Sequence, residues 1–569
     1  MPKRTDINSI MIIGSGPIVI GQACEFDYSG TQACKALKGL GYKVILVNSN
    51  PATIMTDPVV ADVTYIEPLN VDRLRQIIAR EKPDALLPNL GGQTGLNLSM
   101  ELQKTGVLDE YNVKVIGVQL DAIKRGEDRM EFKNTMTKLG IEMPNSSEAF
   151  SVEQAMEIAD ELGYPVVIRP AFTMGGTGGG IVYNNEELQT VAGRGIQASI
   201  AGQILVEESV LGWEELEVEV VRDSKNQMVI VCMIENIDPM GVHTGDSFCA
   251  APMLTISEEL QARLQRTAFD IISEIGVIGG TNVQFAHDPQ TDRVVIIEIN
   301  PRTSRSSALA SKATGFPIAY VSALLAAGFT LDEIPYWKNG TLEKYVPYGD
   351  YVVLKFARWA FEKFAGIEDK IGTQMRAVGE TMSIGRTFKE AFQKAIRSLE
   401  IGRSGLGYAK NFHDLSVEEL LQKIATPNSE RYFAIYEAIR KGLNTDEIHN
   451  ITKIKKYFLQ LISELVDTEK EISAYKKRVL PDELLIKAKK DGFADKYLSM
   501  LLDVPEEYIR LHRSVAGIRE EWDIVPVSGA DAEYFYSTYN GPGILGGELA
   551  ASREKRGLAA KANLRNRKR

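Results

Sequence analysis

Short apolar runs alternate with amphipathic stretches over residues 1–127. The apolar runs are Ser9–Ile13, Lys43–Val47, Asp84–Pro88 and Lys114–Gly117, and a helical stretch near Thr31–Leu40 connects the first two. Short apolar runs separated by amphipathic stretches are typical of buried parallel strands that are joined by helices. The pattern therefore predicts a small parallel α/β domain over residues 1–127.

Residues 128–402 show an α+β pattern. Ser151–Leu162 is predicted to be helical, with Ser151 as its N-cap and Gly163 after its end, and Glu258–Ile275 is predicted to be a longer helix. Strand-like segments lie before and after each helix. The pattern predicts an α+β domain that is distinct from the first domain.

The pattern after residue 403 is helical almost throughout. Ser416–Glu419 is a capping box, and Ile454–Asp467 is a long amphipathic run. We therefore expect an all-helical domain at 403–540 and a flexible basic tail at 541–569. The predicted fold class is α/β overall: a parallel-sheet domain, an α+β domain and an all-helical domain.

The segment Tyr164–Tyr183 has the composition of a phosphate-binding hairpin. Two apolar strands enclose Arg169 and a run in which five of six residues are glycine, among them Gly175 and Gly176. Glycine backbone N–H groups can approach phosphate oxygens closely, and an arginine adds charge at the base. No Lys-Ser/Thr pair follows, so this is not a P-loop. Taken alone, the pattern also fits a flexible surface hairpin.

Two later strands carry oxygen-bearing side chains near their ends. Glu298 and Asn300 stand at positions i and i+2 of one strand, and Gln284 lies on a neighbouring strand. Strand alternation places Glu298 and Asn300 on one face, with Ile297 and Ile299 facing a core on the other. An oxygen-only ligand set suits Mg²⁺ or Mn²⁺ that holds nucleotide phosphates.

Gly14-x-Gly16 follows the first strand and raises the question of dinucleotide binding. The next glycine comes only at Gly21, and Asn48 ends the second strand where an acidic ribose ligand is expected. We therefore do not expect NAD(P) or FAD at this loop.

Length, charge and cysteine content narrow the class of protein. A chain of 569 residues is too long for one core, and its net charge of −11 argues against nonspecific nucleic-acid binding. The four cysteines show no metal-ligand spacing, as expected for buried thiols in a reducing cytosol. Without a signal peptide or an apolar run approaching ~18 residues, we expect a soluble cytoplasmic protein with no membrane partner.

Taken together, the motifs resemble those of the ATP-grasp family. The order is Arg129, Arg169, the glycine-rich run, Glu208 to Glu215, His243, Gln284 and Glu298–Arg302. Three segments are similar in particular to the amino-terminal half of carbamoyl phosphate synthetase large subunits, namely Pro17–Gly30, Asn48–Asp57 and Arg302–Lys312. This resemblance covers residues 1–540. It implies a pre-ATP-grasp domain at 1–127, a two-lobed ATP-grasp domain at 128–402 and a helical oligomerisation domain at 403–540.

The resemblance also implies a reaction. ATP would phosphorylate bicarbonate to carboxyphosphate, and ammonia would convert carboxyphosphate to carbamate, as a ligase of pyrimidine and arginine biosynthesis. Because phosphoryl transfer depends on positioning and charge neutralisation, the site needs metals and arginines more than a nucleophile.

Roles for individual residues follow from the same resemblance. Glu298 would bridge two Mg²⁺ or Mn²⁺ ions, with Gln284 and Asn300 as outer ligands. Arg302 and Arg305 would act with Glu298 in catalysis, because two cations suit bicarbonate and carboxyphosphate. Glu208 and Val210 would lie at the adenine and Glu215 at the ribose. The full nucleotide-binding set would be Arg129, Arg169, Gly175, Gly176, Glu208, Val210, Glu215, Gly241, Val242, His243, Gln284 and Glu298.

The partners expected are those of an incomplete enzyme. No Cys-His-Glu glutaminase arrangement is visible, so ammonia would come from solution or from a glutaminase small subunit. The chain has one glycine-rich lid and one metal platform, so a second synthetase half, on another chain or on a second copy in an oligomer, would make carbamoyl phosphate. Two alternatives remain open: another ATP-grasp carboxylate ligase, such as a biotin carboxylase or a purine-pathway carboxylase, and a non-catalytic truncated paralogue that serves assembly or regulation.

Overall fold

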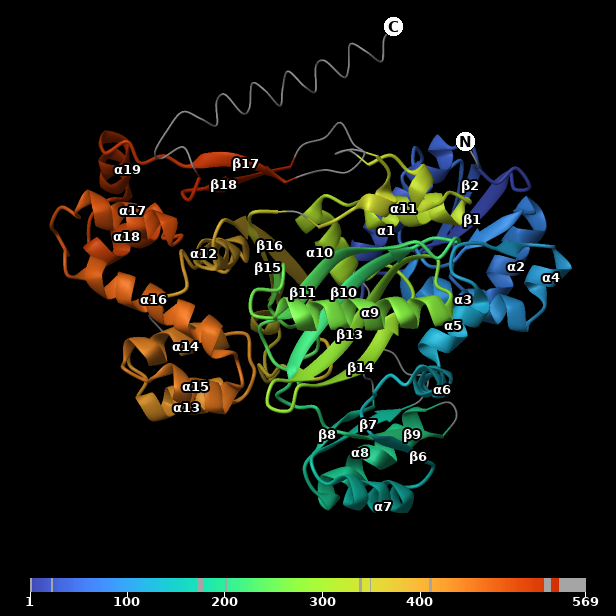
Figure 1. Cartoon of the computed structure of the whole chain (residues 1–569), viewed down its shortest axis with the longest axis horizontal. Helices are drawn as coiled ribbons and strands as arrows, with labels where there is room; N and C mark the ends of the chain where they lie inside the picture. Colours follow the sequence, from blue (N-terminus) through green and yellow to red (C-terminus); the bar gives the residue numbers. More distant parts are fainter. Residues whose placement is uncertain are drawn as a thin grey trace, which may run out of the picture.

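The computed structural model describes residues 3–21, 24–170, 178–199, 202–336, 340–347, 349–408, 412–525 and 534–541. Figure 1 shows a parallel-sheet body in blue, a large green sheet at the centre with a small lobe below it, and an orange helical region on the far side of the central sheet from the blue body. The central sheet therefore lies between the parallel-sheet body and the helical region, with the small lobe at one end.

The first body confirms the predicted parallel sheet. Its strands run in the order β3-β2-β1-β4-β5 and all of them pair in parallel. Helix α1 starts earlier than the predicted stretch at Thr31. The elements are β1 (Ser9–Ile13), α1 (Cys24–Gly39), β2 (Lys43–Asn48), β3 (Val63–Ile66), α2 (Val71–Glu81), β4 (Ala85–Leu87), α3 (Gly92–Lys104), α4 (Val107–Glu110), β5 (Lys114–Val115) and α5 (Leu120–Glu127).

The small lobe is an antiparallel sheet covered by two helices. Its strand order is β6-β9-β7-β8, and alanine and valine side chains of α7 and α8 pack against it. The side chain of Ser151 caps α7 as predicted, because it accepts a hydrogen bond from the Gln154 backbone. The elements are β6 (Ser146–Ala149), α7 (Val152–Leu162), β7 (Val166–Pro170), β8 (Gly180–Val182), α8 (Asn185–Ala198) and β9 (Ile204–Glu208).

The central sheet is antiparallel and buries α9 on one face. Its order is β14-β13-β10-β11-β12-β15-β16, and apolar side chains of β10, β13 and β14 pack against α9. The elements are α6 (Arg129–Leu139), β10 (Glu214–Arg222), β11 (Met228–Asn236), β12 (Cys249–Ala251), α9 (Glu258–Ile275), β13 (Gly279–Asp288), β14 (Arg293–Asn300), α10 (Arg305–Thr314), α11 (Ile318–Ala326), β15 (Val352–Arg358) and β16 (Gly379–Gly385).

A β-bulge corrects one expectation about β14. Gln284 pairs with Glu298, but the next residue, Phe285, pairs with Ile296, so Ile297 is an extra residue in β14. Ile299 faces the α9 core as predicted. The prediction for Ile297 is wrong: it packs with Val210 and Ala286 on the other face of the sheet.

The helical region is confirmed and ends in a hairpin that the hydrophobic pattern does not predict. The Ser416 capping box forms, and the long helix α16 covers Lys456–Ser473. The elements are α12 (Phe388–Ser398), α13 (Val417–Ala425), α14 (Arg431–Arg440), α15 (Thr445–Thr452), α16, α17 (Asp482–Lys490), α18 (Asp495–Leu502), α19 (Glu506–Val515), β17 (Glu521–Val525) and β18 (Tyr534–Thr538). Apart from Gly541, the predicted tail lies outside the described residues.

Within the described part of the chain, no single helix is long and apolar enough to cross a membrane. Helices α10 and α11 pass that test only as a pair, by length and composition, and they are bent by 108°. Their apolar side chains belong to a core shared with β1 and β2.

Candidate functional site

Oxygen-bearing side chains from three adjacent strands meet on the face of the central sheet opposite α9. On β10, Glu217 pairs with Gln284 of β13, and Gln284 pairs in turn with Glu298 of β14. Two residues before Gln284 on β13, Asn282 pairs with Asn300 of β14. The predicted neighbourhood of Gln284, Glu298 and Asn300 is therefore present, and a row of β10 carboxylates extends it.

The oxygens at this platform suit a cation that shares its ligands with phosphates. Gln284 Nε2 donates to Asn282 Oδ1 at 3.1 Å, which leaves its carbonyl oxygen as the atom able to bind a metal. Asn300 Oδ1 already accepts from Arg302 Nη2 at 2.9 Å. No three His, Cys, Asp or Glu side chains among the described residues form a metal-binding group. A cation beside Glu298 must therefore draw on amide oxygens, water and phosphates, as Mg²⁺ does in nucleotide sites.

Arg129 and Arg169 bring two positive charges to the same region. Arg129 begins α6, whose N-cap Asp128 accepts hydrogen bonds from two backbone N–H groups. Burial and the positive charge of Arg169 lower the pKa of Arg129. Glu207, which forms an ion pair with Arg169, and Glu298 raise the pKa of Arg169. Two guanidinium groups whose positive charges act on each other provide a favourable place for a bound anion.

Arg302 and Arg305 are held by the first body. Arg302 Nε donates to Gln93 Oε1 of α3 at 3.0 Å. Arg305 Nε donates to Glu25 Oε1 of α1 at 3.1 Å, and both side chains are largely buried. Neither Nη atom of Arg305 has a hydrogen-bond partner among the described residues. Buried guanidinium N–H groups without a protein acceptor are suited to binding a small anion.

A small buried apolar cluster lies beside the platform. Val210, Ala286, Val295 and Ile297 pack together, with Trp213 and Met240 against them. Because Ala286 follows Gln284 at i+2, this cluster stands on the same face as the platform. An aromatic base is bound in proteins against apolar side chains of this kind.

The predicted adenine and ribose carboxylates differ in what they contact. Glu208 accepts from Asn145 and pairs with Arg293 Nη2 at 2.7 Å, so it links the small lobe to β14. Glu215 is 4% exposed, and its Oε2 has no partner within the described residues. Burial and the charge of Glu217 raise the pKa of Glu215 well above its usual range. Glu215 thus has an oxygen that can accept a hydrogen bond from a ligand, whereas both oxygens of Glu208 are engaged by Asn145 and Arg293.

Gly241, Val242 and His243 follow Met240, whose backbone pairs with Gly212 and Trp213 beside the apolar cluster. Gly241 has a φ of +117°, and a Cβ there would lie 2.3 Å from Leu211 Cδ1. Burial lowers the pKa of His243. Its Nδ1 accepts from the Gly245 backbone at 3.0 Å, so the neutral ring carries its proton on Nε2 and can donate there. Gly175 and Gly176 lie outside the described residues.

The sequence reasoning missed two buried carboxylates, Glu217 and Glu219. Glu217 Oε1 accepts from Asn236 and Thr244, and its Oε2 accepts from Asn282 and Ser306. Glutamates alternate with apolar residues along β10 at positions 215, 217 and 219. That period of two, read as one face of a strand, was the available signal.

Three regions of the chain match protein families. Residues 6–125 match the carbamoyl phosphate synthase preATP-grasp domain, and residues 128–334 match the carbamoyl-phosphate synthase L chain ATP binding domain. Residues 380–517 match the carbamoyl-phosphate synthetase large chain oligomerisation domain.

Relatives match over nearly the whole chain. The carbamoyl phosphate synthase large chain of Archaeoglobus fulgidus is 53% identical over 549 residues, which are 95% of this chain and 51% of that protein. The corresponding protein of a Nostoc species is 51% identical over 549 residues, with coverage of 95% and 50%. The chain therefore spans about half the length of the curated relatives it matches.

Solved structures share the fold at low sequence identity. Biotin carboxylase of Campylobacter jejuni superposes with a TM-score of 0.53 at 17% identity, over 78% of this chain and 99% of that chain. The biotin carboxylase domain of Hydrogenobacter thermophilus 2-oxoglutarate carboxylase, in complex with MgADP, ADP and bicarbonate, has a TM-score of 0.53 at 17% identity and coverage of 69% and 90%. At this identity the likeness shows the fold alone.

Proposed function

Because the chain belongs to the carbamoyl phosphate synthase large-chain family, we propose that it uses ATP to phosphorylate bicarbonate and that ammonia converts the product to carbamate. The observation that carries this proposal is the convergence of the Gln284–Glu298 platform with two pairs of arginines on one sheet face. One pair suits nucleotide phosphates and the other suits a small anion.

The nucleotide would occupy the face between the small lobe and the central sheet. Arg129 and Arg169 would bind its phosphates, and the apolar cluster around Val210 would take the base. Mg²⁺ or Mn²⁺ held by Glu298, with Gln284 and Asn300, would neutralise charge on the phosphates when bound. His243 would donate from Nε2 to a nucleotide oxygen.

Bicarbonate would lie against Arg302 and Arg305. The Nη donors of Arg305, which have no partner in the described part of the chain, would hold it while one of its oxygens attacks the γ-phosphorus, so that the bond to ADP breaks and carboxyphosphate forms. Ammonia would then attack the carboxyl carbon. Phosphate leaves, a proton is lost from nitrogen, and carbamate remains.

The other substrates and partners follow from the same family membership. The ammonia source would be a separate glutaminase small subunit. Cys34, Cys232 and Cys249 are buried as expected, but the expectation is wrong for Cys24, which is exposed near the start of α1. Burial raises the pKa of the Cys34 and Cys249 thiols to about 12, which makes them unsuitable as thiolate nucleophiles. A second synthetase half would phosphorylate carbamate to carbamoyl phosphate for pyrimidine and arginine synthesis in the cytoplasm.

Bicarbonate-dependent ATP hydrolysis by the purified chain tests the proposal. We expect ADP release that requires both bicarbonate and Mg²⁺ and that free biotin does not stimulate. Stimulation by biotin would favour a biotin carboxylase-like ligase. ATP binding without turnover under any of these conditions would favour a non-catalytic paralogue.

A further inference from the structure

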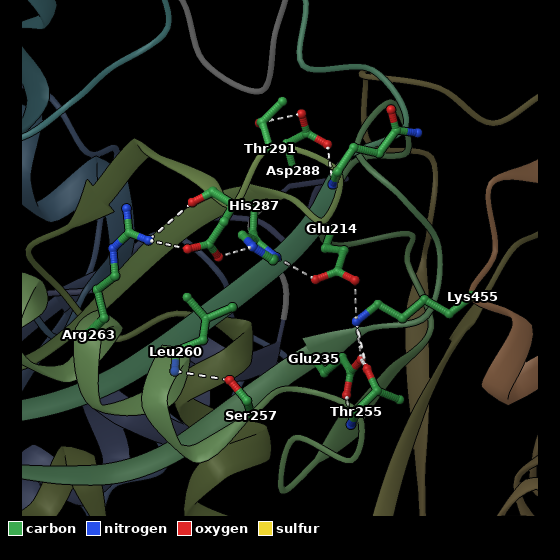
Figure 2. Close-up of polar contacts among 12 residues, drawn as sticks. Glu214, Glu235, Thr255, Ser257, Leu260, Arg263, His287, Asp288, Thr291 and Lys455 are labelled. Atoms are coloured by element: carbon green, nitrogen blue, oxygen red, sulfur yellow. Dashed lines mark hydrogen bonds and ion pairs between the residues drawn. The ribbon is translucent and has the colours of Figure 1, made fainter.

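Lys455 crosses from the helical region to the central sheet and is largely buried there. It stands at the N-cap of α16, and its Nζ lies 2.8 Å from Glu214 Oε1 of β10 and 2.6 Å from Glu235 Oε1 of β11. Its Nζ also donates to Thr255 Oγ1 at 2.6 Å. Figure 2 shows the Lys455 side chain pointing toward these three side chains.

The contact is part of an alternating row of charges. Glu214 Oε2 lies 2.8 Å from His287 Nδ1, and His287 Nε2 lies 3.0 Å from Asp292 Oδ1. Burial lowers the pKa of His287, but the two carboxylates outweigh burial and the pKa is raised overall. The row thus runs Asp292, His287, Glu214, Lys455, Glu235. Figure 2 labels the last four of these residues. When His287 is protonated, each inner charge has an opposite charge on both sides.

Glu235, at one end of this row, is held in place by burial and by backbone hydrogen bonds. It is fully buried, and its Oε2 accepts from the Leu254 and Thr255 backbones at 2.8 and 2.9 Å. Without Lys455, a buried carboxylate would remain with no positive partner in direct contact. Breaking a buried ion pair by removing one partner is strongly unfavourable, so the docking of α16 on this sheet should be specific.

Within this row, Glu214 lies next in sequence to the apolar cluster around Val210. Glu214 follows Trp213, and residues 209–213 form the loop that carries Val210; we call it the nucleotide loop. The loop is closed by Gly212 N donating to Met240 O at 2.9 Å and by Trp213 N donating to Val210 O at 3.1 Å. A Cβ at Gly212 would lie 3.2 Å from Lys453 Cγ, so the turn before α16 packs against the same loop.

We propose that Lys455 is a positioning residue through which the helical region holds the nucleotide loop in its binding geometry. The inference rests on the proposed function, because the loop is taken to contact the base of ATP. A change in the seating of α15 and α16, such as assembly with another subunit, would then alter nucleotide affinity without any new contact to the nucleotide.

The test compares Lys455→Met with Lys456→Met in the whole chain. Lys456 is the next residue of the same helix, 60% exposed and paired only with Asp446 on the surface. For Lys455→Met, we expect the KM for ATP in bicarbonate-dependent hydrolysis to rise about five- to ten-fold with kcat within about two-fold, as for lost ground-state binding. Lys456→Met should leave both constants unchanged.

Amide hydrogen exchange gives a readout that does not depend on turnover. Lys455→Met should speed the exchange of residues 210–214 while α9 keeps its protection. In a double-mutant cycle, the effects of Glu214→Gln and Lys455→Met on the KM should be less than additive, because the two substitutions remove one shared contact. The part of the Glu214→Gln effect that remains additive belongs to its second contact, with His287.

Unchanged exchange in the loop and an unchanged KM in a folded Lys455→Met protein would overturn the proposal. A fall in kcat alone, or loss of protection throughout the chain, would also overturn it and assign Lys455 a purely structural role. If the wild-type chain shows no ATP turnover, the proposed function fails, but faster exchange confined to the loop would still support the coupling.

Discussion

Glu298 is the residue whose charge reaches most of the site. Its carboxylate raises the pKa values of Arg129, Arg169 and His243, although burial leaves the pKa of Arg129 and His243 lowered overall. It therefore lies close enough to both arginines and to the histidine to act on the charge of all three. A metal placed there would be central to the site.

Replacing Glu298 with glutamine removes this charge and preserves the size of the side chain. We expect bicarbonate-dependent ATP turnover to fall by a factor on the order of 100 or more, because even outer-shell changes at metal sites cost about ten- to hundred-fold. Steady-state ADP release measures it. Glu507→Gln, exposed on α19, is the control, and near-normal turnover by a folded Glu298→Gln protein would contradict the metal assignment.

Glu219 should make stability depend on pH. Burial raises its pKa from 4.5 to about 7. A carboxyl with a raised folded-state pKa favours folding when protonated, so its contribution is full below pH ~4.5 and is lost as pH rises to about 7. Glu219→Gln cannot ionise. We expect the unfolding free energy of the variant, relative to wild type, to increase by on the order of 1–3 kcal/mol over this range.

Denaturant unfolding of both proteins at several pH values between 5 and 8 measures this difference. The hydrogen bonds that Asn282, Ser304 and Ser307 donate to Glu219 change on substitution, which shifts the difference by a constant. Only the slope with pH reports the ionisation. A difference that stays flat across the range would show that Glu219 does not titrate there.

Single residues also mark the limit of what the sequence predicts. Strand alternation places Glu298 and Asn300 on one face correctly, and Gln284 lies beside them on the neighbouring strand as expected. It misplaces Ile297, because a bulge depends on the partner strand and not on the local pattern. The arginine that holds Glu208 comes from β14, far away in sequence, so local motifs could not reveal that contact.

At the scale of elements, the loop around Gly241 depends on a backbone geometry that few residues adopt. Its φ of +117° lies in a region nearly restricted to glycine, and a Cβ would press on Leu211. Gly241→Ala should cost about 1–3 kcal/mol of local strain and displace the nucleotide loop, so the KM for ATP should rise several-fold.

The matched control is Gly39→Ala at the end of α1, where a Cβ meets nothing within 4 Å. Its ATP kinetics should equal those of the wild type. Initial-rate measurements over a range of ATP concentrations compare the two variants. If Gly241→Ala also behaves as wild type, the loop tolerates a shift and does not shape the nucleotide site.

Helices with clear caps are the elements that the sequence predicts best. Helix α9 covers the predicted Glu258–Ile275, and α7 follows its Ser151 cap, because both ends are set by local hydrogen bonds. The hairpin β17–β18 was not predicted. It is short, and its side chains bind distant groups, as Thr538 binds Glu390 and Asp523 binds Arg386, so its stability is largely tertiary.

At the scale of the whole molecule, the helical region and the central sheet share one core. Phe248, Phe356 and Tyr432 pack together across their boundary, and Tyr432 donates to Asp238 at 2.9 Å. The sequence predicts an α+β region and a helical region, but not that they are continuous in this way. Because the two regions share one core, a shift of the helices relative to the central sheet can change the candidate site on that sheet.

The chain spans about half the length of its matched relatives, and this bears on what it can synthesise alone. The sequence has one glycine-rich run of this kind and one Gln284–Glu298 pair, and under the proposed function these serve one phosphoryl transfer. Carbamoyl phosphate synthesis needs two such transfers, to bicarbonate and then to carbamate. With ATP, bicarbonate and ammonium, we therefore expect this polypeptide to release ADP and form carbamate, but to make carbamoyl phosphate efficiently only when a second synthetase unit is added.

Trapping carbamoyl phosphate with ornithine and a transcarbamoylase, alongside ADP release, measures both steps. Glutamine should replace ammonium only when a glutaminase subunit is present. The amount of trapped product should be compared between monomeric and dimeric fractions of the chain. Efficient synthesis by a strictly monomeric fraction would contradict the prediction, because one site would then perform both transfers. Synthesis confined to a dimer would instead mean that a second copy supplies the other transfer, and would make the interface between copies part of the enzyme.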